Sequence, residues 1–260
     1  MKRFTLLLAL SAGLLVACSS SSDGTASNGT ATNGTGDATA GTDGDPTAAH
    51  RLTFTTNDGT QVDYVLVVPP GRAVGVPGKV IWAFPPGGQD IDLAEQLVNE
   101  KYRAEALARD YVVFSPAAPK GALFYTDTSA ALVPELLDMA ATLFPPEDGR
   151  FDLVGVSNGG LSAFRAAIEH PDRFRSLVVF PGYSPDGGDD PALSKLKGIG
   201  VAMFVGGNDS GWLESSTATR DALKAQGNKV ELTVIAGQGH ILGDALPGKE
   251  LFDALERVRA

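Results

Sequence analysis

The sequence contains very little cysteine and histidine. Cys18 is the only cysteine in the 260 residues, so no disulfide can form within the chain and no group of thiolates can hold a metal. The three histidines, His50, His170 and His240, leave little material for another kind of metal site. We therefore expect neither a metal centre nor a cysteine nucleophile in the folded part of the chain.

Basic residues are also scarce. The 21 lysines and arginines stand against 31 aspartates and glutamates, which gives a formal net charge of −10. Nucleic acids and anionic membrane surfaces are bound by basic patches, so we expect neither as a partner. The hydrophobic content of 43% is ordinary for a soluble globular protein, and one α/β domain is the simplest organisation for this length.

The apolar run over residues 4–16 is shorter than the roughly 20 residues of a membrane-spanning helix. Because it follows Lys2 and Arg3, it is typical of an export signal, which we place at residues 1–17. The signal ends in Leu15-Val16-Ala17-Cys18, which resembles the bacterial lipobox, and the alternative is an ordinary secretory signal. The resemblance implies a lipid on Cys18. It also implies a place in the bacterial cell envelope, either periplasmic or surface exposed, on the outer membrane if the cell has one.

Residues 18–50 are predicted to form a disordered tether behind that lipid anchor. After Cys18 this segment contains no aromatic residue, lysine or arginine and consists mainly of Ser, Thr, Gly, Asn, Asp and Ala. Such a composition cannot bury enough apolar surface to fold. The folded domain is therefore expected at residues 51–260.

Strand and helix patterns alternate through residues 51–260. A hairpin is expected first, followed by buried strands and by helices with one apolar face. Such alternation predicts an α/β fold with a mostly parallel sheet and helices on both faces. Ligands then bind at the carboxyl ends of the strands. The strands are expected at residues 52–56, 62–66, 79–84, 111–114, 151–156, 176–180, 200–205 and 229–235, and the helices at 91–109, 129–144, 161–168, 215–226 and 246–258.

A candidate nucleophile lies where the strand at 151–156 meets the helix that follows it. Gly155, Ser157 and Gly159 fit the pattern GxSxG, in which the serine occupies a strained turn and its neighbours must lack bulk. The alternative is a glycine-rich turn with a serine that caps the helix. The strand before the motif and the helix after it favour the nucleophile.

A serine nucleophile needs a base, and the base needs a carboxylate that orients it. His240 is the candidate base because it follows the last predicted strand in a glycine-rich loop, whereas His170 closes a helix and His50 lies at the tether junction. Asp209 is the candidate acid because it follows the strand at 200–205. The rivals are Glu214 and Asp244, and the alternative role for Asp209 is that of a turn residue that hydrogen-bonds to the local backbone.

The order Ser157, Asp209, His240 on an alternating α/β chain resembles the α/β-hydrolase family. More narrowly, Gly155-Val156-Ser157-Asn158-Gly159-Gly160 and Gly206-Gly207-Asn208-Asp209 are similar to small secreted esterases akin to feruloyl esterases and polyhydroxybutyrate depolymerases. The resemblance implies an α/β-hydrolase fold. It also implies hydrolysis of a small-molecule or polymer carboxylic ester through an acyl-enzyme, without cofactor or metal.

That family usually carries His-Gly after its third strand, whereas this chain has Pro85-Pro86. Proline has no N–H, so the resemblance places the oxyanion donors at the backbone of Gly88 or Gln89, together with Asn158. Trp212 and Tyr183 are candidates for an aromatic-tolerant substrate pocket, although aromatic residues there are as often plain packing.

Two further functions stay open. The change to Pro85-Pro86 also fits a surface-tethered binding protein that keeps the fold and has lost turnover. A serine peptidase would use the same three residues.

Overall fold

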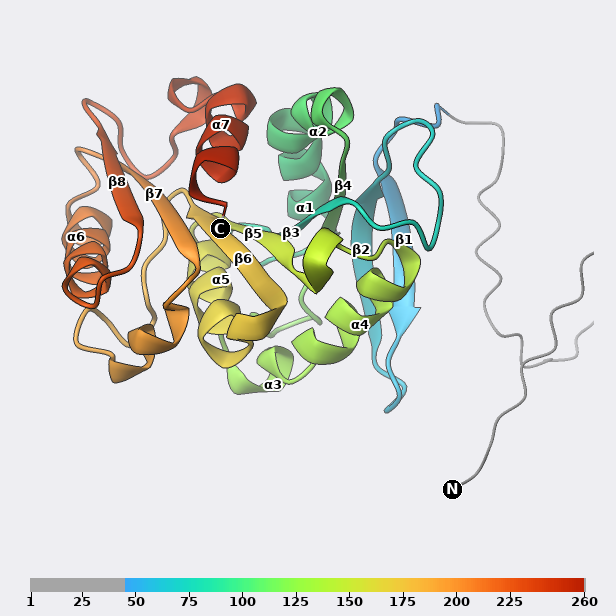
Figure 1. Cartoon of the computed structure of the whole chain (residues 1–260), viewed down its shortest axis with the longest axis horizontal. Helices are drawn as coiled ribbons and strands as arrows, with labels where there is room; N and C mark the ends of the chain where they lie inside the picture. Colours follow the sequence, from blue (N-terminus) through green and yellow to red (C-terminus); the bar gives the residue numbers. More distant parts are fainter. Residues whose placement is uncertain (1–44, 260) are drawn as a thin grey trace, which may run out of the picture. The chain divides into compact units, whose positions relative to one another are not determined.

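The computed structural model describes residues 45–259, and a single sheet of eight strands runs through them (Figure 1). The strand order is β1-β2-β4-β3-β5-β6-β7-β8. The first three strands in this order pair antiparallel, and all other neighbours pair parallel. The strands are β1 (His50–Thr55), β2 (Gln61–Val67), β3 (Lys79–Phe84), β4 (Tyr111–Pro116), β5 (Phe151–Gly155), β6 (Phe174–Val179), β7 (Gly200–Gly206) and β8 (Val230–Ile235). The predicted mostly parallel sheet is confirmed.

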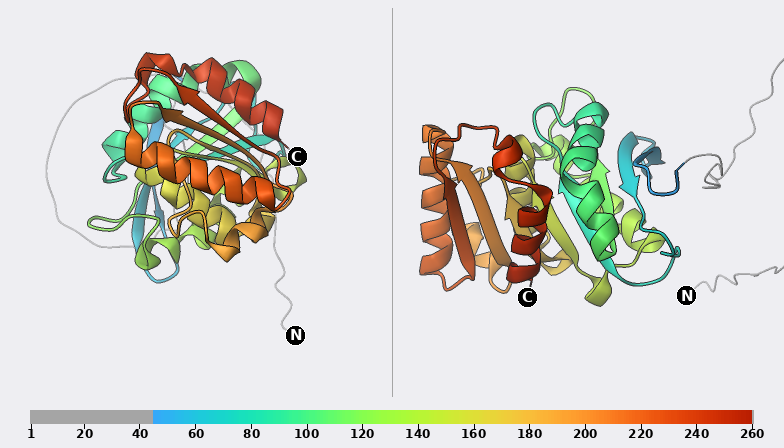
Figure 2. Two further views of the ribbon diagram at one scale, coloured as in Figure 1. Left: turned by 90° about the vertical axis from the view of Figure 1, so that its left-hand side faces the viewer. Right: turned by 90° about the horizontal axis from the view of Figure 1, so that it is seen from above.

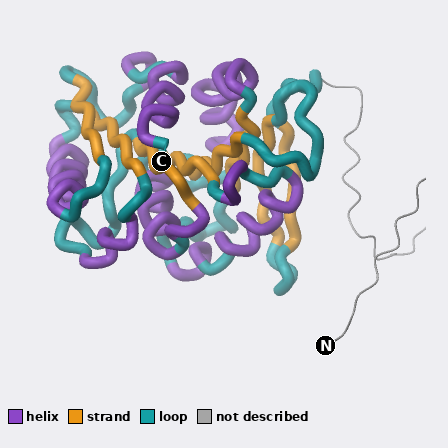
Figure 3. The backbone as a smooth tube through the Cα atoms, viewed as in Figure 1, coloured by secondary structure: helices purple, strands orange, loops and turns teal. Residues whose placement is uncertain are grey.

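Helices cover both faces of the sheet, as the tube drawing shows (Figure 3). Because side chains alternate along a strand, β3 sends Trp82 into one core cluster and Ala83 into the other. The first cluster lies under α4 (Val133–Leu143), α5 (Asn158–Glu169) and α6 (Ser210–Ala225). The second lies under α1 (Ile91–Leu97), α2 (Arg103–Arg109) and α7 (Gly248–Val258), which Figure 2 shows together when seen from above. Burial on both sides explains why the central strands are continuous apolar runs.

Three predicted helices differ from the observed ones. The helix expected over 91–109 is divided by a π-helical segment, η1 (Val98–Tyr102). The helix expected over 129–144 is broken into α3 (Asp127–Ala130) and α4, because Pro134 lacks an N–H and is accommodated only in a first turn. Helix α6 begins at Ser210 rather than 215, so the loop that carries Asp209 is shorter than predicted.

The folded domain begins before the predicted boundary at residue 50. Arg103 Nε donates to the Thr47 carbonyl at 2.8 Å, and the guanidinium also pairs with Asp45 at 2.9 Å. His50 is already part of β1. Residues 45–49 therefore belong to the folded domain rather than to the predicted tether, because these contacts hold them there.

The predicted signal segment, Cys18 and the greater part of the predicted tether lie outside the described residues. None of the helices within residues 45–259 is long and apolar enough to cross a membrane.

A buried ion pair fastens the last helix to the middle of the sheet. Asp152, in β5, is fully buried and accepts a hydrogen bond from Ser176 Oγ at 2.7 Å. Arg259, directly after α7, donates to the same carboxylate at 3.1 Å. Burial raises the pKa of Asp152, and the positive charge of Arg259 opposes that effect. These contacts occur near the amino end of β5, at the sheet edge opposite to the one that carries Ser157.

The carboxyl ends of β3, β5, β6, β7 and β8 meet at one edge of the sheet, because these strands are parallel neighbours. The segments that follow β5, β7 and β8 contain Ser157, Asp209 and His240. The segment that follows β3 contains the loop of residues 85–89. The fold therefore brings together four segments that are far apart in the sequence.

Candidate active site

Ser157 occupies the sharp turn between β5 and α5. Its backbone has φ 54° and ψ −119°, a conformation that residues with side chains seldom adopt. The Ser157 N–H donates to the Pro181 carbonyl at 2.9 Å, which holds the turn in place. The predicted arrangement of strand, tight turn and helix is confirmed, and it exposes the hydroxyl above the edge of the sheet.

Packing requires glycine on both sides of Ser157. A Cβ atom at Gly155 would collide with the carbonyl of Gly159, and one at Gly159 would collide with the carbonyls of Phe84 and Pro85. A larger residue at either position would therefore push α5 away from β5 and β3. The Ser157 side chain makes no capping hydrogen bond to α5, so it is not the simple helix cap considered as an alternative.

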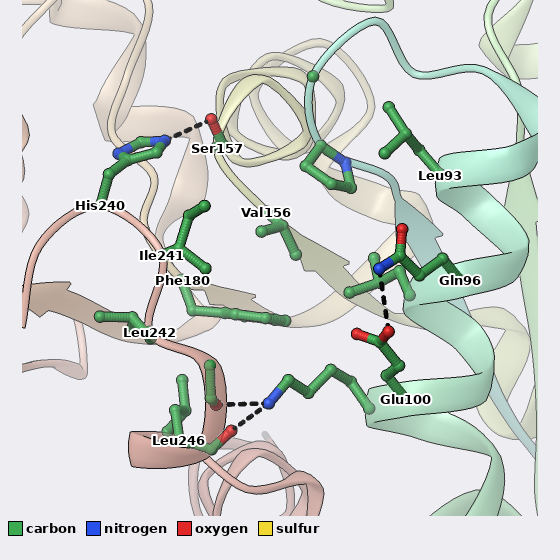
Figure 4. A pocket seen from close by; sticks show the side chains of 15 residues that line it. Leu93, Gln96, Glu100, Val156, Ser157, Phe180, His240, Ile241, Leu242 and Leu246 are labelled. Atoms are coloured by element: carbon green, nitrogen blue, oxygen red, sulfur yellow. Dashed lines mark hydrogen bonds between the residues drawn. The ribbon is translucent and has the colours of Figure 1, made fainter.

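The structure joins Ser157, His240 and Asp209 in one hydrogen-bonded series (Figure 4 shows its first bond). Ser157 Oγ lies 2.8 Å from His240 Nε2, and His240 Nδ1 lies 2.7 Å from Asp209 Oδ2. A carboxylate only accepts hydrogen bonds, so Asp209 fixes the hydrogen on Nδ1. The free Nε2 can then accept the hydroxyl proton of Ser157.

Asn208 ties together the loops that carry Asp209 and His240. Its backbone N–H donates to the Gln238 carbonyl at 2.8 Å, and its side-chain amide donates to the Gly237 carbonyl at 3.1 Å. Because the two loops are bonded to each other, the carboxylate and the imidazole keep their relative positions. Sequence reasoning missed this role, although an asparagine directly before the acid was a visible signal.

The rival residues lie elsewhere. Glu214 is an exposed residue within α6, and Asp244 is exposed in a single 3-10 turn. His170 follows the end of α5, and His50 is exposed at the start of β1. The hydrogen bond of His240 Nδ1 goes to Asp209. Within residues 45–259, no three His, Cys, Asp or Glu side chains form a group suited to a metal ion.

Gln89 is a buried residue of the loop after β3, and its polar groups are already used. Its backbone N–H donates to the Pro86 carbonyl at 2.9 Å. Its side-chain amide donates to Ser162 Oγ at 2.9 Å and accepts a hydrogen bond from the Phe124 N–H at 2.7 Å. The prediction that Gln89 supplies an oxyanion donor is therefore wrong, because its N–H closes a turn instead of facing Ser157.

Gly87, rather than Gly88 or Gln89, is the residue of this loop that lies beside Ser157. Gly87 lines the cleft beside Ser157, whereas Gly88 does not. The Gly87 carbonyl accepts a hydrogen bond from Asn158 Nδ2 at 2.8 Å, which fixes the loop against α5. In the described part of the chain, neither the Gly87 N–H nor the Asn158 N–H donates to a backbone carbonyl. Sequence reasoning missed Gly87, although it is the first residue after the two prolines that has an N–H.

We predict that Gln89→Ala destabilises the protein and slows turnover. Alanine leaves the buried Phe124 N–H without its partner, which costs about 2 kcal/mol, or roughly 4 to 8 °C in the midpoint of thermal unfolding. Turnover falls as well, because Gln89 holds the loop that contains Gly87. The control is Ser162→Ala, which removes one bond of Gln89 and keeps the bond to Phe124. Equal unfolding midpoints for wild type and Gln89→Ala would contradict this role.

A largely apolar cleft of about 430 Å³ opens beside Ser157 and His240 (Figure 4). Its floor is formed by Val156 and Phe180, and it runs between α1 with η1 on one side and the segment after His240 on the other. The lining residues are Pro86, Gly87, Leu93, Gln96, Leu97, Glu100, Lys101, Val156, Ser157, Phe180, His240, Ile241, Leu242, Gly243 and Leu246.

Trp212 and Tyr183 do not line this cleft, which corrects their assignment as residues of the substrate pocket. Trp212 lies in the first turn of α6, and its ring packs against the ring of His240 at 4.7 Å between centroids. Tyr183 packs on Trp212 at 4.9 Å. The early start of α6 explains the difference, because it directs Trp212 to the imidazole rather than into the cleft.

The sequence matches the model of a known protein family. A family model described as Esterase matches residues 93–253, which is more than half of the chain and includes Ser157, Asp209 and His240. The chain belongs to the Esterase family. The prediction of an esterase enzyme is thereby confirmed. The comparison with curated proteins gives no significant match.

Solved structures with the fold of this esterase include other esterases and hydrolases. A thermostable esterase aligns with a TM-score of 0.63 at 18% identity, over 81% of this chain and 62% of that chain. This chain thus spans less than two thirds of that protein. S-formylglutathione hydrolase from Agrobacterium tumefaciens aligns with a TM-score of 0.61 at 21% identity, over 82% and 96% of the two chains. Thermogutta terrifontis esterase 2, phosphorylated by paraoxon, aligns with a TM-score of 0.58 at 15% identity, over 82% and 92%. At these identities the likeness concerns the fold, and the predicted α/β-hydrolase fold is confirmed.

Proposed function

We propose that this esterase hydrolyses carboxylic esters through an acyl-enzyme formed on Ser157. The observation that carries the proposal is the unbroken hydrogen-bonded series from Ser157 through His240 to Asp209. A serine hydroxyl is a poor nucleophile by itself, and a base oriented by a carboxylate activates it. Ser157 is the nucleophile, His240 is the general base and acid, and Asp209 orients His240.

The reaction proceeds in two halves. Ser157 Oγ bonds to the ester carbonyl carbon while its proton passes to His240 Nε2. The resulting oxyanion accepts hydrogen bonds from the backbone N–H groups of Gly87 and Asn158. The bond to the alcohol then breaks, and His240 gives the proton to the leaving oxygen. In the second half, water loses a proton to His240 and bonds to the acyl carbon, after which Ser157 leaves with that proton.

Fluorophosphonate labelling tests the activated serine. An inhibitor of this kind bonds to a serine only when a base activates it, so we expect labelling at Ser157 and hydrolysis of p-nitrophenyl esters. A surface-tethered binding protein without turnover would show neither. A serine peptidase would be labelled too, and it would cleave amides at rates comparable to esters.

The narrower resemblance to feruloyl esterases and polyhydroxybutyrate depolymerases rests on the motifs around Ser157 and Asp209. It suggests an ester of a hydroxycinnamic acid or of a polymer as the substrate. The support is limited to sequence, because Trp212 and Tyr183 lie outside the cleft. Hydroxycinnamoyl esters and hydroxybutyrate oligomers in the same panel test this substrate class.

The lipid anchor at Cys18 is a further part of the proposal, and the lipobox resemblance alone supports it. A lipid on Cys18 would hold the enzyme on a membrane of the bacterial cell envelope. We predict that Cys18→Ser abolishes lipidation and leaves the protein either uncleaved or soluble. Mass spectrometry of the mature N-terminus measures the result. An unmodified N-terminus at a residue other than Cys18 in the wild type would overturn the anchor.

A further inference from the structure

The cleft beside Ser157 has an apolar body and a polar end. The aliphatic side chain of Leu93 lies across the cleft from those of Leu242 and Leu246 (Figure 4), and Leu97 and Phe180 also line it. Leu97, Leu242, Leu246 and Phe180 are each less than 9% exposed, so this part of the cleft is walled by the protein core. Binding of a hydrocarbon group against such a lining is favourable, because the group leaves water. A polar group would find few hydrogen-bond partners there.

Polar residues mark the far end of the cleft, which is open to water. Lys101 Nζ donates to the carbonyls of Gly243 at 2.6 Å and of Leu246 at 3.1 Å, which ties η1 to the segment after His240. Gln96 and Glu100 are exposed and bonded to each other at 2.9 Å. His240 lies at one end of the cleft and Glu100 at the other (Figure 4). The cleft is therefore a channel with the reacting groups at one end and water at the other.

The helix that forms one wall indicates the length of this channel. The wall extends from Leu93 to Lys101, which at about 1.5 Å of rise per residue is about 12 Å. An extended alkyl chain advances about 1.25 Å per carbon, given C–C bonds of about 1.5 Å. A chain of about eight to ten carbons thus fills the distance from Ser157 to the polar end.

We propose that the cleft binds the aliphatic acyl chain of medium-length esters, with octanoyl as the best fit. This inference rests on the proposed function, because it needs Ser157 as the nucleophile. The acyl chain is placed here for a geometric reason. His240 must reach the leaving oxygen, so the alcohol lies at the imidazole, whereas the channel extends from Ser157 and His240 toward Glu100 at its other end.

A series of p-nitrophenyl esters from acetate to dodecanoate tests the assignment in the wild-type enzyme. We expect kcat/KM to rise about fourfold for each added methylene up to octanoate, since each one leaves water for the cleft. Beyond decanoate it falls or levels off, because the chain passes Gln96 and Glu100 into water. In a parallel series of alkyl acetates, in which the alcohol is lengthened instead, we expect kcat/KM to change little. Release of acid measures the turnover of these esters.

A matched pair of variants tests where the acyl chain of the substrate lies. Gln96→Trp puts an indole at the polar end, and we expect it to lower the octanoate-to-butanoate ratio of kcat/KM by about tenfold or more. Asn99→Trp places the same bulk on η1, directly after α1, at an exposed residue that does not line the cleft, and we expect no change of the ratio. Thermal unfolding of both variants verifies that they are folded.

The outcomes separate this inference from the proposed function. An active enzyme with a flat acyl series, or one that prefers a hydroxycinnamoyl ester to octanoate, keeps the esterase and overturns the acyl-chain assignment. If kcat/KM rose along the alkyl acetates alone, the cleft would bind the alcohol, and the acyl-chain assignment would be overturned. An unchanged ratio in a folded Gln96→Trp variant also contradicts it. Absence of turnover on every ester would contradict the proposed function and the assignment together.

Discussion

Replacing Ser157 by alanine is expected to lower kcat for ester hydrolysis by a factor on the order of 10⁴ to 10⁶. The substitution removes the atom that bonds to the acyl group, and water near His240 replaces it poorly. Free energy of unfolding should change by about 1 kcal/mol or less, because Ser157 lies on a half-exposed turn and its side chain bonds only to His240. The measurements are the hydrolysis of p-nitrophenyl butanoate, fluorophosphonate labelling and thermal unfolding.

Ser194→Ala is the matched control for this experiment. Ser194 is exposed in a short 3-10 helix, and its hydroxyl bonds only to the carbonyl of Pro191. We expect wild-type turnover and labelling in this variant. If folded Ser157→Ala kept more than about a hundredth of the wild-type kcat, the nucleophile would have to be a different residue.

Asp209→Asn is expected to lower kcat by about 10⁴-fold while KM changes little. The asparagine amide donates a hydrogen bond toward His240 Nδ1 and so favours the tautomer with hydrogen on Nε2. That nitrogen can then no longer accept the proton of Ser157, although all three side chains stay in place. Fluorophosphonate labelling should slow in parallel, because it requires the same activation of the serine.

The rival carboxylates provide the controls for Asp209. Glu214→Gln and Asp244→Asn remove charge without removing a hydrogen bond to His240, so turnover should stay within about twofold of the wild type. If one of these two variants lost activity to the extent expected for Asp209→Asn, the assignment of the orienting acid would be wrong. Because all three changes replace a carboxylate by its amide, the comparison isolates the position of the group.

Local patterns in the sequence determined most of the elements and the position of the candidate nucleophile, Ser157. Alternation of apolar residues predicts β1 and β2, and continuous apolar runs predict the buried strands. The motif of Gly155, Ser157 and Gly159 predicts a sharp turn, because small residues beside a serine permit the close contact of strand and helix. These properties depend on neighbours in the chain, so no tertiary information is needed.

Helix limits were less predictable, because caps and breaks depend on single positions. Pro134 breaks the segment predicted as one helix, and α6 starts five residues before its predicted beginning, which shortens the loop of Asp209. The attachment of residues 45–49 to the domain depends on contacts with Arg103, which lies more than fifty residues away. Periodicity alone carries no information about such contacts.

The sequence by itself thus determined the α/β class, the strand-turn-helix around Ser157, and the candidate partners Asp209 and His240. The tertiary structure alone decided how these residues meet, since Ser157 and His240 are 83 positions apart and only the order of the parallel strands brings them to one edge. It also replaced Gln89 by Gly87 beside Ser157 and moved Trp212 out of the pocket. The physical reason is that a backbone N–H or a side chain acts according to the direction in which the fold points it, and packing between distant segments sets that direction.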